Sequence, residues 1–267
     1  MGISRRVEEA RKAFAKRDRD ASAEAHQAGR IMEAREEHGG LSHQYIGDMV
    51  YGGLDGIITT FAVVSGVAGA QLGANIVLIL GLANLFADGF SMATGAYLSS
   101  KSEQEYYDRE WQREMWEVEN FPEGERLELV KIYRDQGYSE EDAAQIVDIQ
   151  ARTPERWVKA MMVEELGLLP DERKPLLSGL ATFVSFVVAG VVPLIVYLVG
   201  LVAPIPSGTA FPASLGLSAL ALFGLGAAKV LVTKLSFLRS GIEMLLVGGL
   251  AAGVAYGVGA LLKGIGG

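Results

Sequence analysis

The sequence contains no cysteine and only three histidines among its 267 residues. The lack of cysteine excludes disulfide bonds, thiolate metal sites and cysteine nucleophiles. Carboxylates, methionine and histidine remain as the metal-binding side chains of note, so any metal site should be rich in oxygen ligands.

Charge is also scarce over most of the chain. Residues 1–44 hold nine bases and eight acids, residues 101–175 hold eleven bases and twenty acids, and the rest of the chain holds only four of each. The acidic middle segment would repel nucleic acid phosphates and attract cations. We therefore expect no nucleic acid partner and a positively charged one.

Half of the residues are hydrophobic, and they are gathered in long blocks. Such blocks are long enough to cross a hydrocarbon core of about 30 Å, so the bilayer is an expected partner. The sequence predicts an all-α integral membrane protein with five transmembrane helices. The predicted spans are residues 45–70, 75–100, 177–202, 211–233 and 240–262.

Between the second and third spans the sequence becomes charged and rich in helix-forming residues. Helix breaks are expected at Asn120–Pro122, Gln136–Ser139 and Thr153–Pro154, which indicates a cytosolic insert of three helices. Ahead of the first span, one polar helix is expected from Ser4 to Glu37. The predicted domains are an N-terminal extension (1–44), transmembrane helices 1–2 (45–100), an acidic metal-binding insert (101–175) and transmembrane helices 3–5 (176–267).

An odd number of spans places the termini on opposite sides of the membrane. Nearly all bases outside the spans fall on the side of the N-terminus and the insert, and only Lys263 dissents. By the positive-inside tendency, the N-terminus and the insert are predicted to be cytosolic. The spans are rich in Gly, Ala and Ser, which permits close helix packing and favours self-association.

Four acids fall within the membrane regions: Asp48, Asp55, Asp88 and Glu243. An ionised carboxylate in hydrocarbon is costly unless it is paired, hydrated or bound to a cation, so these residues are functional candidates. Thr59 lies one helical turn after Asp55 and could offer a hydroxyl beside its carboxylate. The alternative is that Asp55 only bonds a neighbouring helix.

Asp48 and Met92 extend this candidate path along the first two spans. Asp48 lies seven residues before Asp55, so both carboxylates can face one groove, although water near the membrane surface could also solvate Asp48. Met92 lies one turn after Asp88, and its thioether suits Fe2+ better than Mg2+ or Ca2+. Met92 could equally serve only in packing.

Acids recur at helical spacing in the insert. Glu110, Glu114 and Glu117 share one helix face, as do Glu125 and Glu128, and Met161-Met162 precede Glu165. Converging carboxylates could bind cations, whereas the common alternative for a charge run is a solvated face.

Three segments resemble the vacuolar iron transporter family: LDGIITTFAVVSGVAGA, LANLFADGFSMATGAYLSSKSEQEYY and AMMVEELGL. The resemblance runs from about Tyr45 to the C-terminus. The three motifs stand in the family's order, with an acidic insert between the second and third spans, so the resemblance is specific.

The resemblance implies a five-span protomer that forms a homodimer, with a path between the first spans and a cytosolic three-helix metal-binding domain. In such a family Fe2+ leaves the cytosol in exchange for protons, and some relatives handle Mn2+. The membrane would be the plasma or inner membrane of a prokaryote, or the vacuolar membrane of a eukaryote. The resemblance implies metal ligands at Asp48, Asp55, Met92, Glu110, Glu114, Glu117, Glu125, Glu128, Met161, Met162 and Glu165.

Other functions remain open at this point. A membrane-anchored metal sensor or storage protein would need no intramembrane acids, and a passive metal channel would need no coupling. An enzyme such as a ferroxidase is disfavoured, because paired Glu-x-x-His helices are not visible, and no catalytic cofactor is expected. His26, His38 and His43 lie in a polar segment and receive no role.

Overall fold

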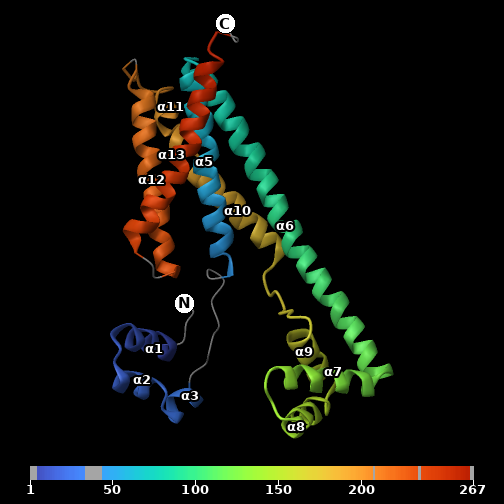
Figure 1. Ribbon diagram of the computed structural model, residues 1–267. Coiled ribbons are helices and arrows are strands. Elements are labelled where there is room, and N and C mark those ends of the chain that lie inside the picture. Colours follow the sequence, from blue (N-terminus) through green and yellow to red (C-terminus); the bar gives the residue numbers. More distant parts are fainter. Residues whose placement is uncertain (1–4, 34–43, 207, 234–235, 265–267) are drawn as a thin grey trace. The chain divides into compact units, whose positions relative to one another are not determined.

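The computed structural model describes residues 5–33, 44–206, 208–233 and 236–264. The chain divides into a membrane unit, formed by the described parts of residues 1–96 and 176–267, and an insert unit, residues 97–175. The described residues form helices and no strands (Figure 1). In chain order these are α1 (Arg5–Lys16), α2 (Arg19–Ala25), α3 (Ala28–Glu33), α5 (Ile46–Gly69), α6 (Ala74–Asn120), α7 (Pro122–Asp135), α8 (Glu140–Gln150), α9 (Pro154–Glu164), α10 (Pro175–Gly190), η1 (Val192–Leu194), α11 (Ile195–Val199), α12 (Ala210–Thr233) and α13 (Phe237–Leu261).

Five helical segments are long and apolar enough to cross a membrane: α5, α6, α10 with η1 and α11, α12, and α13. They confirm the predicted number of spans. Large apolar side chains point outward from them, with Phe90, Leu220 and Leu250 each at least 70% exposed. Such a surface suits hydrocarbon, and the continuous helices satisfy their own backbone groups there. The chain is therefore a multi-pass membrane protein.

Helix α6 does not end where the second span was predicted to end. It continues past residue 100 to Asn120 and is 47 residues long. The predicted end of the span at residue 100 marks a change in polarity and does not coincide with the end of the helix. Residues 96–120 contain neither proline nor glycine, so nothing in the local backbone stops the helix.

The third predicted span is interrupted. The segment Pro175–Val199 is long and apolar enough for one crossing, as predicted, but α10 ends at Gly190 and a 3-10 turn around Pro193 precedes α11. Proline has no backbone N–H and its ring clashes with the preceding turn. The hydroxyl of Ser214 on α12 donates to the Pro193 carbonyl at 2.6 Å, so a neighbouring span satisfies this group.

The N-terminal segment forms three short helices, α1 to α3, where one was predicted. Arg17 adopts a φ of 56°, which ends α1, and the Asp18 carboxylate then accepts from the Ala21 N–H at 3.0 Å and caps α2. The His26 ring contacts the Ser22 carbonyl at 2.7 Å. His38 and His43 lie outside the described residues.

Helix α5 lies against α12 and α13 in the membrane unit (Figure 1). Two glycines allow other backbones to approach it closely. A Cβ on Gly56 would clash with the Phe186 carbonyl on α10, and a Cβ on Gly259 of α13 would clash with the Gly66 carbonyl on α5. These contacts fix the helix that carries Asp48 and Asp55.

The helices of the insert unit begin and end at the three breaks expected from the sequence. Proline occupies the first turns of α7 and α9, where its missing N–H costs nothing. Ser139 caps α8 by accepting from the Asp142 N–H at 3.1 Å. The apolar faces bury one core, formed by Val118, Leu129, Tyr133, Ala143, Val147, Trp157, Val158, Met161 and Met162.

Candidate metal centre

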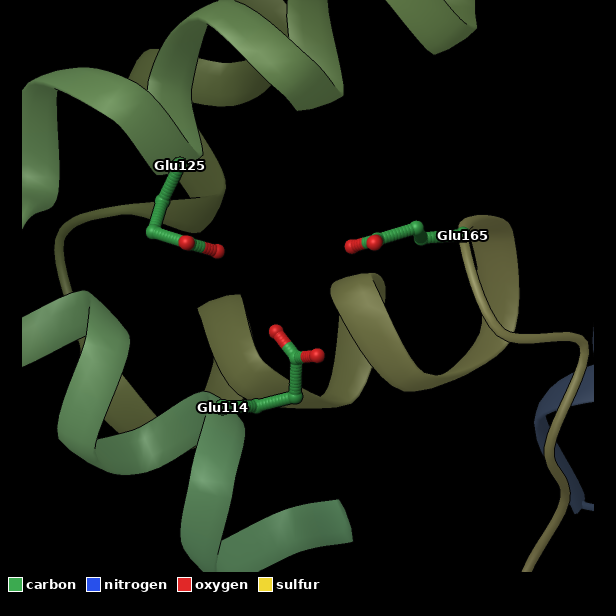
Figure 2. Close-up of side chains that lie close together, drawn as sticks. All are labelled: Glu114, Glu125 and Glu165. Atoms are coloured by element: carbon green, nitrogen blue, oxygen red, sulfur yellow. The ribbon is translucent and has the colours of Figure 1, made fainter.

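Three carboxylates from different parts of the insert unit converge on one point. Glu114 lies on α6, Glu125 lies on α7, and Glu165 directly follows α9. One carboxylate oxygen of each lies within 4.8 Å of one from each of the others. Figure 2 shows the three side chains pointing toward one another. We call Glu114, Glu125 and Glu165 the carboxylate trio.

Short connections and a buried core hold the trio in place. A single residue separates the end of α6 from the start of α7, so the chain reverses between Glu114 and Glu125. The Glu165 N–H donates to the Met161 carbonyl at 2.9 Å, and the Met161 side chain is fully buried in the core. The carboxylates therefore stand on anchored backbone, which preorganises them for a shared cation.

The trio is electrostatically strained. Burial is the main cause that raises the pKa of Glu114 and of Glu125 to about 7. Neighbouring acids contribute to both shifts, and Arg113 opposes the shift of Glu114. Burial likewise raises the pKa of Glu165, with Glu128 as the next contributor. Each carboxylate is therefore disfavoured in its charged form beside the others.

Two oxygens of the trio lack hydrogen bonds. Glu114 is 1% exposed and Glu125 is 6% exposed, and in the part of the chain that the structure describes, the Oε2 atom of each has no partner. Burying an acceptor without a partner costs about 1–3 kcal/mol, and more when it is charged. A cation or a proton between these oxygens would remove that cost.

Glu110 and Glu117 share the helix face of Glu114, as predicted, but Arg113 binds all three. Its guanidinium lies 2.9 Å from Glu110, 2.5 Å from Glu114 and 2.5 Å from Glu117. The hydrogen bond from Arg113 lowers the pKa of Glu110. Glu110 and Glu117 thus lie beside the trio with an arginine as their present partner.

The other predicted ligands of the insert border the trio. Glu128 is exposed, and its charge helps to raise the pKa of every trio member. Met161 and Met162 are fully buried in the hydrophobic core. Met161 lies one turn before Glu165, so it remains a predicted ligand, while Met162 is a core residue in this arrangement.

In the membrane unit, Asp48 on α5 accepts a hydrogen bond of 2.5 Å from the buried hydroxyl of Ser178 on α10. The carboxylate is half-buried. This hydrogen bond fixes the direction of the carboxylate. The predicted intramembrane acid is therefore oriented by a residue of another span.

Asp55 on α5 is half-buried and lies close enough to Asp88 on α6 for their charges to interact. Two acids in a membrane interior favour a shared cation or proton. The Thr59 hydroxyl, expected near the Asp55 carboxylate, donates to the Asp55 backbone carbonyl at 2.8 Å. Met92 is half-buried and packs against the apolar core of this unit.

Sequence reasoning missed two residues that contact the candidate ligands. Arg113 could have been found, because it is spaced three, one and four residues from Glu110, Glu114 and Glu117 on one helix. Ser178 could not have been found from the sequence, because it lies 130 residues from Asp48.

The donor set is chemically selective. Carboxylate oxygens suit hard and borderline divalent cations. Two of the trio's oxygens have no hydrogen-bond partner among the described residues. The residues therefore fit the binding of a divalent cation.

Several known proteins are similar to this chain in sequence. The sequence profile of the VIT family matches residues 46–260. A vacuolar iron transporter of Toxoplasma gondii is 41% identical over 97% of this chain and 89% of its own length. Vacuolar iron transporters of Plasmodium falciparum (38% identity, 73% of each chain) and Arabidopsis thaliana (34% identity, 80% of this chain and 84% of its own) are also similar.

These relatives are transporters, and their similarity covers the spans and the insert together. The chain belongs to the VIT family, the family of the vacuolar iron transporters.

Proposed function

We propose that the protein exports Fe2+, and also Mn2+, from the cytosol across its membrane in exchange for protons. Membership of the family supports metal transport. The observation that carries the rest is the pair of buried carboxylate oxygens of Glu114 and Glu125 that have no partner among the described residues, and that a divalent cation would satisfy.

The route begins at the insert and continues through the first two spans. Metal loads onto the carboxylate trio, with Glu117, Glu128 and Met161 as further ligands. It passes to Asp48 and is then held by Asp55 and Met92, with Asp88 beside Asp55. The N-terminus and the insert face the cytosol in this proposal, and the C-terminus faces the opposite side.

Two copies of the chain would form the path. The face of α5 that carries Asp55 also carries Tyr51, which is 66% exposed within one chain. A half-buried acid beside an exposed face would meet lipid in a monomer, at considerable cost. A homodimer that joins the α5 helices would place these acids between protomers.

Proton coupling follows from the same burial cost. A carboxylate that has lost its cation in a low-dielectric site binds a proton more readily. Metal leaving Asp55 on the far side is thus replaced by a proton, which is carried back. This exchange distinguishes an antiporter from a passive channel.

The test is uptake of Fe2+ and Mn2+ into proteoliposomes, with and without an acidic interior. The proposal expects uptake that an acidic interior accelerates and that moves protons outward. A rate of metal uptake that does not depend on the pH gradient would indicate a passive channel. Metal binding without any uptake would favour a sensor or storage protein.

A pair of variants links uptake to the insert. Glu114→Gln with Glu165→Gln should raise the metal concentration needed for half-maximal uptake about tenfold or more, since it removes two charged ligands. Glu140→Gln, in the first turn of α8, is the matched control and should leave uptake unchanged. Equal behaviour of the two variants would contradict a capture role for the trio.

A further inference from the structure

Arg113 occupies an unusual place among the acids of the insert. Its guanidinium pairs with Glu114 and Glu117 at 2.5 Å and with Glu110 at 2.9 Å, all from the same helix. Glu114 also belongs to the carboxylate trio, and Glu117 is a proposed ligand. One arginine therefore holds carboxylates that the proposed function assigns to metal.

The arginine and a metal would compete for Glu114. Its Oε1 atom accepts from Arg113, whereas its buried Oε2 atom has no partner within the described chain. A divalent cation shared with Glu125 and Glu165 would lie within a few ångströms of the guanidinium. Like charges at that separation repel strongly in a half-buried site.

Arg113 is able to leave. Its side chain is 41% exposed, while the Glu114 side chain is 1% exposed. The arginine can swing into water without opening the core, whereas the carboxylate cannot follow it. Glu110 would still have Arg109 as a partner, whose guanidinium lies 3.3 Å away.

We propose that Arg113 is an internal competitor of the transported metal. It neutralises Glu114 and Glu117, is displaced when a divalent cation binds to the trio, and returns to promote release of that cation. This role rests on the proposed function and adds a means of regulation to the same site. The arginine keeps the affinity of the insert low enough for metal to be handed on.

The expected effect follows from the ion pairs that metal binding must break. Arg113 is partly exposed, so each of its ion pairs contributes modestly, and charge-assisted hydrogen bonds to Glu114 and Glu117 add to this. Removing the positive charge of Arg113 should therefore tighten metal binding by roughly tenfold, since about 1.4 kcal/mol corresponds to a factor of ten.

The experiment measures Mn2+ binding to the purified full-length protein in detergent by titration calorimetry. A pH of 8 keeps proton competition small. Arg113→Gln should bind Mn2+ about tenfold more tightly than the unaltered protein. Arg113→Lys keeps the charge but not the planar fork, and should fall between the two.

Arg134→Gln is the matched control. It removes one positive charge from the same unit, but its partner is Glu140, at 3.6 Å, and not a member of the trio. It should leave Mn2+ affinity within about twofold of the unaltered value, because a charge on the surface is screened by salt. Thermal-unfolding midpoints verify that each variant is folded.

Two kinetic measurements separate competition from a merely structural role. Release of Mn2+ after addition of a chelator should be slower in Arg113→Gln by a similar factor. Transport by this variant should show a lower KM together with a lower maximal rate, because metal binds well but leaves the insert slowly.

The results distinguish this inference from the proposed function. Suppose Glu114→Gln weakens Mn2+ binding but Arg113→Gln leaves it unchanged or weaker. The trio then binds metal and the competitor role is wrong. If Glu114→Gln with Glu165→Gln has no effect on Mn2+ binding, the trio is not the capture site. The proposed role of the insert and the competitor role of Arg113 are then both wrong.

Discussion

At the scale of single residues, the chemistry depends on acids that are placed where their charge is unfavourable. The core of the insert unit leaves Glu114 and Glu125 buried, with one oxygen each that has no hydrogen bond among the described residues. Hydrogen bonding and ion pairing normally relieve such a cost. Arg113 relieves only part of this cost, through the other oxygen of Glu114, and under the proposed function a divalent cation supplies the rest.

Metal binding to the trio should weaken as pH falls. The pKa values of Glu114 and Glu125 are raised to about 7 by burial, so both carboxyls take up protons between about pH 8 and 6. Mn2+ affinity should fall about tenfold or more across that range, as measured by calorimetry. Glu114→Gln should bind weakly at every pH, and an affinity that does not change with pH would contradict the placement of the trio.

The same pKa values determine a trend in stability. A carboxyl whose pKa is higher in the folded than in the unfolded state stabilises the fold below the unfolded value, and this stabilisation is lost as pH rises through about 7. In the presence of a chelator, the thermal-unfolding midpoint should therefore fall from pH 5 to pH 8. Added Mn2+ should raise it most at pH 8. A midpoint that rises with pH under chelation would refute this assignment.

Asp55→Asn should abolish transport while it leaves metal binding to the insert intact. The amide cannot take up a proton or carry the charge that attracts a cation. Radiometal uptake into proteoliposomes and calorimetry on the same preparation measure the two properties. Met49→Leu, on an exposed position of the same helix, is a control expected to transport normally.

At the scale of helices, the residues that start or break a helix were the reliable signal. The three breaks in the insert were predictable, because Pro122, Ser139 and Pro154 act through their own backbone chemistry. The extent of α6 was not predictable from hydropathy, because hydropathy falls at Lys101 while helix propensity does not. Pro193 was visible in the sequence, but only the partner hydroxyl of Ser214 explains how a span tolerates it.

Gly259→Ala should destabilise the membrane unit and reduce transport. A Cβ at this position clashes with the Gly66 carbonyl, so α13 and α5 must separate. We expect the thermal-unfolding midpoint to fall by several degrees. Gly253→Ala, on the same helix with no atom within 4 Å of the added Cβ, is the matched control and should be neutral or slightly stabilising.

At the scale of the whole molecule, the architecture was largely predictable and the site only in part. The number of spans follows from hydropathy alone, because hydrocarbon imposes one length on every crossing. Helical spacing brought Glu114 together with Glu110 and Glu117. It could not show that Glu165 joins Glu114 and Glu125, because that contact depends on how three helices pack.

The proposed homodimer can be tested by cross-linking, since the chain has no cysteine of its own. Tyr51→Cys places a thiol on the exposed α5 face that carries Asp55, and an oxidant should join two protomers in membranes. Leu220 is 72% exposed on α12, and the control variant Leu220→Cys should not form a disulfide cross-link between protomers. Equal cross-linking at both positions would argue against pairing through α5.

The bond between Ser214 and Pro193 also bears on how the protein is made. Residues 175–199 precede α12 in the chain, so the Pro193 carbonyl has this donor only when the fourth span packs against the third. A chain cut short before residue 210 leaves that carbonyl without this partner in oil. The fourth span thus completes the backbone hydrogen bonding of the third.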